Sequence, residues 1–240
     1  MGRVSYSNAT GRVRNNAGLT TERIVTEALR IIDGQGLGRL TMRRLGDAMS
    51  VEAMAIYHHF PLGKEQLFDA IVEHITDVSP APPRDAVAED HTDEDTDPDA
   101  GAEEAPQDDR PWDERLRSWA HDYRAALLRH SGALSLMINR RPDTPSALRS
   151  QEIHYAAFEE AGLAGADIVR AAALLDAYVT GAVIQQVRLE SVPNPQAPVV
   201  DGRYPHVAAL QGTVLDADAR FEAGLAAVLA SVTAPAGRSA

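Results

Sequence analysis

Residues 40–71 read LTMRRLGDAMSVEAMAIYHHFPLGKEQLFDAI and contain two short helical patterns joined by a tight turn. The first pattern follows Thr41, a residue type that caps helix N-termini. The second covers residues 52–59, and a proline and a glycine end it. An earlier amphipathic pattern over residues 21–33 is expected to support both. Together these are the elements of a helix-turn-helix, a motif that binds DNA.

Apolar and exposed positions separate on the second of these helices. Val51, Ile56 and Phe60 fall where they pack inward. The positions expected to face out and enter a major groove are Glu52, Ala53, Met54, Tyr57 and His58. Two helices that simply pack together are the alternative interpretation of the pattern.

The same stretch resembles the DNA-binding part of the tetracycline-repressor family of bacterial regulators. The match is a Leu-Thr pair, a valine, an aliphatic-Tyr-His-x-Phe motif and a Lys-Glu-x-Leu motif. These motifs fall on Leu40, Thr41, Val51, Ile56, Tyr57, His58, Phe60, Lys64, Glu65 and Leu67. Farther along, FEEAGLAGADIVRAAALLDAYVTG and RFEAGLAAVLASV resemble the C-terminal domain of the tetracycline-repressor subgroup. The resemblance implies an all-α chain, with an N-terminal three-helix helix-turn-helix DNA-binding domain and a C-terminal helical ligand-binding and dimerisation domain.

The resemblance also implies how the chain holds DNA. Thr41, Tyr57 and Lys64 are expected to contact phosphates, which fix the register of a protein on the duplex. Arg43 is expected to reach a base edge. The full set of expected DNA contacts is Thr41, Arg43, Arg44, Glu52, Ala53, Met54, Tyr57, His58 and Lys64.

Charge is distributed unevenly along the 240 residues, whose net charge is -12. Residues 1–64 hold nine basic and five acidic residues, whereas residues 79–111 hold two basic and twelve acidic ones. The acidic stretch has almost no bulky apolar residue, so burial cannot offset its ordering entropy. We expect a solvated spacer there; the alternative is that it competes with DNA for the basic surface.

These features predict four regions. They are a flexible basic arm at residues 1–17, the DNA-binding domain at 18–78, a disordered acidic linker at 79–111, and an effector-binding and dimerisation domain at 112–234.

Helical periodicity continues beyond the acidic stretch. The expected helices cover residues 112–130, 134–138, 145–161, 167–189 and 217–232, with a proline- and glycine-rich loop at 191–215. Aromatic and polar residues of these helices are expected to line an effector pocket that has apolar walls. The candidates are Trp119, Tyr123, Met137, Asn139, His154, Tyr155, Phe158, Asp176 and Thr180. For each of them, a satisfied core or interface residue is the alternative interpretation.

A stripe of small residues marks the helix at 167–189. Ala173, Ala177, Gly181 and Ile184 recur at helical spacing and allow close helix approach. With the last helix, this stripe predicts a two-fold homodimer, and packing within one chain is the alternative.

Several function classes are not expected. The chain has no cysteine, its histidines lack compact metal-ligand spacing, and it contains no P-loop, G-x-S-x-G or G-x-G-x-x-G. We therefore expect no metal, no cofactor and no enzyme. There is also no run of about 18 apolar residues and no signal peptide, which favours a cytoplasmic protein without a membrane partner.

The sequence thus predicts a bacterial transcriptional repressor that a small-molecule effector releases from palindromic double-stranded operator DNA. Two alternatives stay open. One is the same fold without a small effector, the C-terminal domain serving dimerisation or a protein partner. The other is a helical ligand-binding protein or enzyme that has lost DNA binding, which Ser50, Glu52 and an inserted residue near Gly63 make conceivable.

Overall fold

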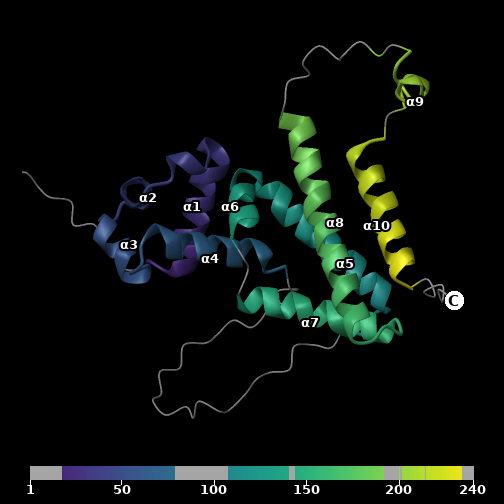
Figure 1. Ribbon diagram of the computed structural model, residues 1–240. Coiled ribbons are helices and arrows are strands. Elements are labelled where there is room, and N and C mark those ends of the chain that lie inside the picture. The colour runs from purple at the N-terminus through teal and green to yellow at the C-terminus, as the bar shows by residue number, and fades with distance from the viewer. Residues whose placement is uncertain are drawn as a thin grey trace, which may run out of the picture. The chain divides into compact units, whose positions relative to one another are not determined.

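The computed structural model describes residues 18–78, 108–140, 144–191, 200, 202–213 and 215–233. All regular structure in these ranges is helical (Figure 1), which confirms the predicted all-α class. The helices are α1 (Thr21–Gln35), α2 (Met42–Met49), α3 (Ala53–His59), α4 (Lys64–Thr76), α5 (Trp112–Arg129), α6 (Leu134–Asn139), α7 (Pro145–Glu160), α8 (Ala166–Ser191), α9 (Pro205–Ala209) and α10 (Ala217–Thr233), with 3-10 turns at Leu37–Arg39 and Ser131–Ala133.

Each predicted helix is present, and its ends differ from the prediction by no more than two residues. The short helix α9 was not predicted, because five residues inside a proline- and glycine-rich loop carry too little periodicity to recognise. The predicted basic arm and residues 79–107 of the predicted acidic linker lie outside the described residues. No described helix is both long and apolar enough to span a membrane.

The chain forms two compact units. Among the described residues, the first combines residues 18–74 with residues 132–140, and the second combines residues 75–78 and 108–131 with those that follow residue 143. Compared with the expected domains, the boundary falls within α4, and the segment that carries α6 groups with the DNA-binding helices.

The first unit is built around α1. Thr20 caps this helix by accepting a hydrogen bond from the Arg23 backbone N–H at 3.2 Å. The helices of this unit, with the loops between them, bury a core of aliphatic and aromatic side chains. Its buried hydrophobic residues include Ile24, Val25, Ala28, Leu29, Ile31, Ile32, Leu40, Leu45, Val51, Ile56, Phe60, Leu67, Phe68, Ile71 and Val72.

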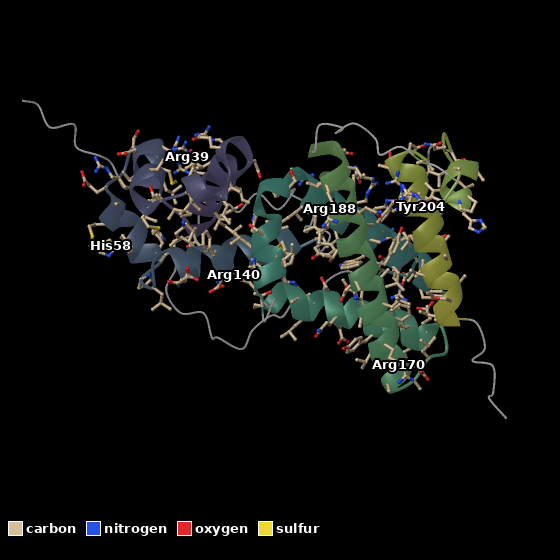
Figure 2. The ribbon with its side chains drawn as sticks, turned by 45° about the horizontal axis from the view of Figure 1, so that its top comes forward. Arg39, His58, Arg140, Arg170, Arg188 and Tyr204 are labelled. Atoms are coloured by element: carbon tan, nitrogen blue, oxygen red, sulfur yellow. The ribbon has the colours of Figure 1, made fainter. Side chains whose placement is uncertain are left out.

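Packing and charge explain why the α6 segment belongs to this unit. A Cβ atom at Gly132 would lie 2.9 Å from the Ile32 carbonyl oxygen, so the segment approaches the end of α1 closely. The Arg140 guanidinium pairs with Glu65 and Asp69 of α4 and lies 5.2 Å from the centroid of the Phe68 ring. Arg140 is labelled in Figure 2. Helical periodicity could not reveal these contacts between residues far apart in sequence.

The second unit packs α5, α7, α8 and α10 together, and α10 runs along α8 (Figure 1). Its core is apolar and is formed by Leu116, Trp119, Ala120, Ala157, Phe158, Ala171, Ala172, Leu175, Val179, Phe221, Leu225 and Leu229. The last turn of α4 also belongs here. The buried hydroxyls of Thr76 and Ser146 are hydrogen-bonded at 2.9 Å, which ties the end of α4 to the first turn of α7.

Candidate functional site

The turn between α2 and α3 fixes the angle of the second helix. The Thr41 hydroxyl accepts from the Arg44 backbone N–H at 3.1 Å and starts α2. Ser50 ends it with a left-handed backbone, φ 59°, and the Val51 N–H donates to the Gly46 carbonyl at 2.9 Å. A Cβ atom at Gly46 would lie 3.0 Å from the Val51 carbonyl oxygen. Because the turn lies this close to α2, glycine fits position 46 better than any larger residue.

The exposed side of α3 carries the predicted DNA-contact positions. Met54 is 65% exposed and Tyr57 is 38% exposed. Glu52 and His58 are exposed as well, and His58 lies at the outer edge of the helix in Figure 2. Ala53 is only partly exposed. This agrees with the predicted orientation of the helix, while the role of each residue at DNA stays a prediction.

The three basic candidates differ in their surroundings. Arg43 is exposed on α2. Arg44 is also exposed, but its guanidinium donates to the side-chain oxygen of Gln35 at the end of α1. Lys64 is half-buried, and its Nζ lies 5.0 Å from the centroid of the Phe68 ring. These surroundings differ, and the contact that each of the three makes with DNA stays a prediction.

A second candidate site lies inside the other unit, where α5, α7 and α8 meet. His154 of α7 is only 1% exposed, and its ring stands edge-on to Trp119 of α5, with ring centroids 4.1 Å apart. Its Nδ1 lies 3.6 Å from Oδ1 of Asp176 on α8. We call this group the His154 cluster; it comprises Trp119, Tyr123, Ser150, His154, Asp176 and Thr180.

Hydrogen bonding within the His154 cluster is incomplete. The Trp119 Nε1–H donates to the Ser150 hydroxyl at 3.3 Å, and the Tyr123 hydroxyl is hydrogen-bonded to Thr180. Both ring nitrogens of His154 are buried without a hydrogen-bond partner. A buried polar group in this condition costs about 1–3 kcal/mol, so most such groups in proteins are paired.

Burial sets the charge of the two ionisable groups. It lowers the pKa of His154 to about 4, so the imidazole is neutral at pH 7 and has one donor and one acceptor nitrogen. It raises the pKa of Asp176 to about 6, although about half of that side chain is exposed, so the carboxyl is mainly ionised at pH 7.

Five of the nine predicted ligand residues therefore converge: Trp119, Tyr123, His154, Asp176 and Thr180. Phe158 is fully buried in the apolar core of the second unit, and Tyr155 is partly buried against that core. Met137 and Asn139 lie on α6 of the first unit, where the Asn139 amide donates to the Ser135 carbonyl at 2.7 Å.

The sequence prediction missed Ser150, although the signal for it was present. Ser146, Ser150 and His154 are spaced by four residues and share one face of α7. Ser146 bonds Thr76 at the end of α4, and Ser150 bonds Trp119. A stripe of polar residues on a buried helix face indicates partners on neighbouring helices.

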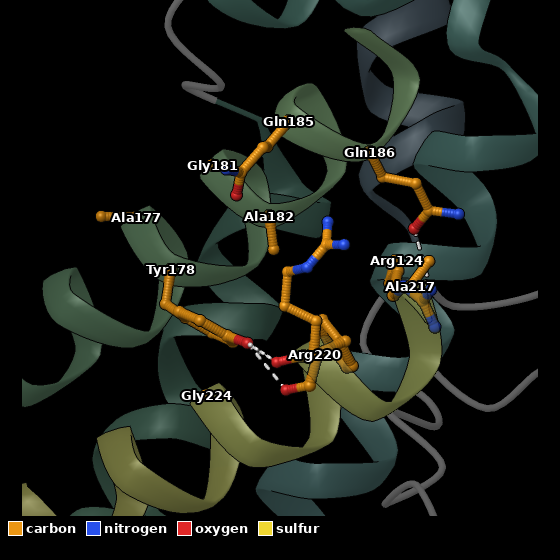
Figure 3. A pocket seen from close by; sticks show the side chains of 11 residues that line it. Arg124, Ala177, Tyr178, Gly181, Ala182, Gln185, Gln186, Ala217, Arg220 and Gly224 are labelled. Carbon is orange, nitrogen blue, oxygen red and sulfur yellow. Dashed lines mark hydrogen bonds between the residues drawn. The ribbon is translucent and has the colours of Figure 1, made fainter. Parts of the chain in front are cut away.

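The outer side of α8 carries the predicted stripe of small residues. Ala173, Ala177 and Gly181 are exposed, and Ile184 is partly exposed, so packing among the described residues does not cover the stripe. Beside it, between α8 and α10, lies a groove of about 420 Å³ that Ala177 and Gly181 help to line (Figure 3).

At this groove α8 and α10 approach closely. The Tyr178 hydroxyl donates to the Phe221 carbonyl at 2.7 Å, and Figure 3 shows its ring reaching from α8 to α10 beside Gly224. A Cβ atom at Gly224 would lie 2.2 Å from the Tyr178 hydroxyl oxygen. Gly224 therefore lets α10 accommodate this tyrosine.

The described part of the chain contains no candidate metal site. No three His, Cys, Asp or Glu side chains gather there in a way that would hold a metal ion.

Two family models match the chain. Residues 24–71 match the model described as bacterial regulatory proteins, tetR family, and residues 105–235 match the tetracycline-repressor-like C-terminal domain. The first match covers the helix-turn-helix, and the second covers the His154 cluster and the α8–α10 groove.

Similar proteins are bacterial regulators. An HTH-type transcriptional regulator of Saccharopolyspora erythraea is 27% identical over 69% of this chain and 60% of its own length, so the chain spans less than two thirds of that relative. The HTH-type transcriptional repressor DrrR1 of Streptomyces coeruleorubidus is 26% identical over 80% of this chain and 68% of the repressor. The class A tetracycline repressor from transposon 1721 in Escherichia coli is 26% identical over 86% of this chain and 87% of the repressor.

Solved structures show the same architecture. Apo ActR from Streptomyces coelicolor superposes with a TM-score of 0.67 and 25% identity, covering 93% of this chain and 99% of ActR. A possible TetR family regulator from the same species has a TM-score of 0.66 and 28% identity, covering 90% of this chain and 99% of its own. Because a family model matches more than half of its residues, this chain belongs to the tetracycline-repressor (TetR) family of bacterial regulatory proteins.

Proposed function

We propose that this protein is a sequence-specific transcriptional repressor of the bacterial cytoplasm, released from a palindromic operator by a small-molecule effector. The exposed side of α3, fixed by the close turn at Gly46, is the single observation that carries the proposal. Its relatives include transcriptional repressors by name, and none of the names cited above describes an enzyme. We therefore propose no catalytic role.

In the proposed complex, phosphate contacts set the register and base contacts set the specificity. Thr41, Tyr57 and Lys64 contact phosphates, and Arg43 pairs with a guanine. Arg44, Glu52, Ala53, Met54 and His58 complete the interface. Two copies of α3 reach successive major grooves when a dimer spaces them by about 34–36 Å, one turn of DNA.

We place the effector at the His154 cluster. Five residues predicted from the sequence converge there, and His154 offers two unpartnered nitrogens. One face of α7 connects the cluster to Thr76 at the end of α4, through Ser150 and Ser146. Since α4 continues from the helix-turn-helix along the chain, a shift of α7 on ligand binding changes how the end of α4 is held. An effector that weakens DNA affinity 100-fold must supply about 2.7 kcal/mol of coupling free energy between its own site and the DNA-binding helices.

We place the two-fold homodimer on the small-residue stripe of α8 and on α10. Ala177→Arg puts a long charged side chain on this stripe and is expected to yield monomers in sedimentation velocity. Ala156→Arg, a matched change on the exposed side of α7, should leave a dimer. Dimers of Ala177→Arg would contradict the assignment.

The test of the proposed function is selection of bound fragments from random duplex DNA at about 50 and 200 mM salt, because phosphate contacts make affinity salt-dependent. We expect an enriched palindrome that survives the higher salt. The Tyr57→Ala variant, checked by circular dichroism and sedimentation, is the control and should enrich much less. No enrichment by a folded, dimeric wild-type protein would refute the proposal.

A further inference from the structure

The geometry of His154 and Asp176 determines which nitrogen of the imidazole is left to accept a hydrogen bond. Nδ1 faces Oδ1 of Asp176 at 3.6 Å, and a carboxylate at this position favours the tautomer with the proton on Nδ1. Nε2 then carries the lone pair. It is buried without a hydrogen-bond donor, so the site lacks a donor at this atom.

The charges around the cluster disfavour an anion. Among the described residues, the group within ion-pair distance of Asp176 is the His154 imidazole, which is neutral at pH 7 because burial lowers its pKa to about 4. No lysine or arginine of the described residues is paired with Asp176. A negatively charged ligand would therefore meet a carboxylate in a partly desolvated site without a compensating cation.

Beside the hydroxyls of Ser150 and Thr180, the cluster contains the aromatic rings of Trp119 and Tyr123 next to the His154 imidazole. The Trp119 and Tyr123 rings have centroids 5.1 Å apart and an interplanar angle of 31°, and His154 stands edge-on to Trp119. These rings already contact one another, and a flat aromatic ligand would extend the same offset and edge contacts.

We propose that the His154 cluster binds a planar aromatic compound that carries no negative charge and presents a hydroxyl or N–H group to Nε2 of His154. This rests on the proposed function only in calling the compound the effector; binding itself needs no DNA. Ligands without the donor leave Nε2 unpaired and bind less tightly, since a buried acceptor rejects an isostere that cannot donate to it.

Three probes of similar size test the proposal by isothermal titration calorimetry on the full chain. They are 2-naphthol, which has the donor; 2-methoxynaphthalene, which lacks it; and 2-naphthoate, which is an anion. We expect 2-naphthol to bind at least about ten-fold more tightly than either of the others, a factor that corresponds to about 1.4 kcal/mol. In protein with ¹⁵N-labelled histidine, the Nε2 signal of His154 should move upfield with 2-naphthol and stay in place with 2-methoxynaphthalene.

Variants separate the donor contact from general packing. His154→Leu should lose at least about ten-fold in 2-naphthol affinity while its affinity for 2-methoxynaphthalene changes little. His121→Leu, an exposed histidine of α5, is the matched control and should bind all probes like the wild type. Asp176→Asn keeps the size of the side chain and should raise 2-naphthoate affinity, which gives a second test if His154→Leu does not fold.

Equal affinities for 2-naphthol and 2-methoxynaphthalene, tightest binding of 2-naphthoate, or no binding of any probe would each overturn the proposal. These outcomes are independent of the DNA selection above. An enriched palindrome without probe binding would leave the regulator assignment intact, and probe binding without an enriched palindrome would leave the ligand assignment intact.

Discussion

The two units of the molecule differ in whether they bury polar side chains. Among the described residues, every buried side chain of the first unit is apolar. The second unit buries four polar ones, namely Thr76, Arg124, Ser146 and His154. DNA approaches a protein from outside, so a unit that reads DNA needs an apolar core that holds an exposed helix at a fixed angle. A small molecule enters a protein, so the groups that would recognise it lie inside. Of these four residues, His154 has no hydrogen bond at either ring nitrogen.

Arg124 shows that buried polar groups in the second unit are not all alike. Its Nη2 donates to Asp218 at 2.7 Å and to Gln186 at 2.8 Å, and its guanidinium lies 4.6 Å from the centroid of the Phe221 ring. It joins α5, α8 and α10, whereas His154 has no hydrogen bond. The Arg124 Nε is also buried without a hydrogen-bond partner, so His154 differs in that neither of its ring nitrogens is paired.

The largest effect is expected at the close turn between α2 and α3 of the first unit. Gly46→Val places its side chain against the Val51 carbonyl and the Ala53 backbone nitrogen, at 3.0 and 3.3 Å from the new Cβ. The turn must open and α3 must rotate, so we expect no measurable operator binding in a fluorescence anisotropy titration. Gly34→Ala on α1, where a Cβ meets nothing within 4 Å, is the control and should raise the free energy of unfolding by about 0.5–1 kcal/mol. If Gly46→Val binds DNA with wild-type affinity, this turn does not fix the orientation of α3.

The second prediction concerns pH and the second unit. The pKa of His154 is about 4 in the folded protein and 6.5 ordinarily, so its contribution to stability is full above pH 6.5 and is lost as the pH falls toward 4. The pKa of Asp176 is about 6 against 3.8, so its contribution is full below pH 3.8 and is lost as the pH rises toward 6. The two contributions oppose each other between pH 4 and 6.

Variants separate these contributions in urea unfolding. Relative to wild type, the unfolding free energy of His154→Leu should fall by about 3 kcal/mol as the pH rises from 4 to 6.5. Relative to wild type, that of Asp176→Asn should change in the opposite direction, rising between pH 4 and 6. Parallel pH profiles for all three proteins would show that neither group is perturbed by burial.

The third prediction tests the exposed chemistry of the first unit. Arg43→Ala and Tyr57→Ala should each weaken operator binding by about 10- to 100-fold, equivalent to about 1–3 kcal/mol, and leave the dimer intact. Arg30→Ala removes an exposed arginine of α1 that pairs with Glu27, and it should change the affinity little. Wild-type affinity in both test variants would mean that the proposed register of α2 and α3 on DNA is wrong.

The smallest effect is expected from the acidic stretch, whose competition with DNA stays a hypothesis. Deletion of residues 82–108 should tighten DNA binding several-fold at low salt, because the stretch at 79–111 carries twelve acidic residues. A neutral glycine-serine replacement of equal length should reproduce the gain if charge is the cause. Unchanged affinity after deletion would leave the stretch a solvated spacer.

Sequence patterns predicted the helices because each one has a local cause. Thr20 and Thr41 cap α1 and α2, Gly36 follows the end of α1, and buried residues recur at helical spacing. The same periodicity oriented α3 correctly, since the residues facing the core alternate with those facing solvent on one short helix. Local patterns therefore gave both the elements and the exposed side of the proposed DNA interface.

Sequence patterns predicted the His154 cluster less completely, because its residues come from three helices. Met137 and Phe158 look as suitable in sequence as Trp119 and His154. Only packing decided that Phe158 fills the apolar core and that Met137 lies in the first unit. The spacing of Ser146, Ser150 and His154 marked a polar face on α7, but the partner of Ser150 is Trp119, 31 residues away, and spacing could not identify that contact.

By itself, the sequence determined the all-helical class, the helix-turn-helix and the family, because caps, turns and periodicity act over a few residues. The tertiary structure alone decided that α6 groups with the DNA-binding helices, through Gly132 against Ile32 and Arg140 on α4. It also decided that His154, Asp176 and Trp119 meet while both histidine nitrogens stay unpaired. The physical reason is that burial and hydrogen bonding depend on distances between residues far apart in the chain, which no local pattern encodes.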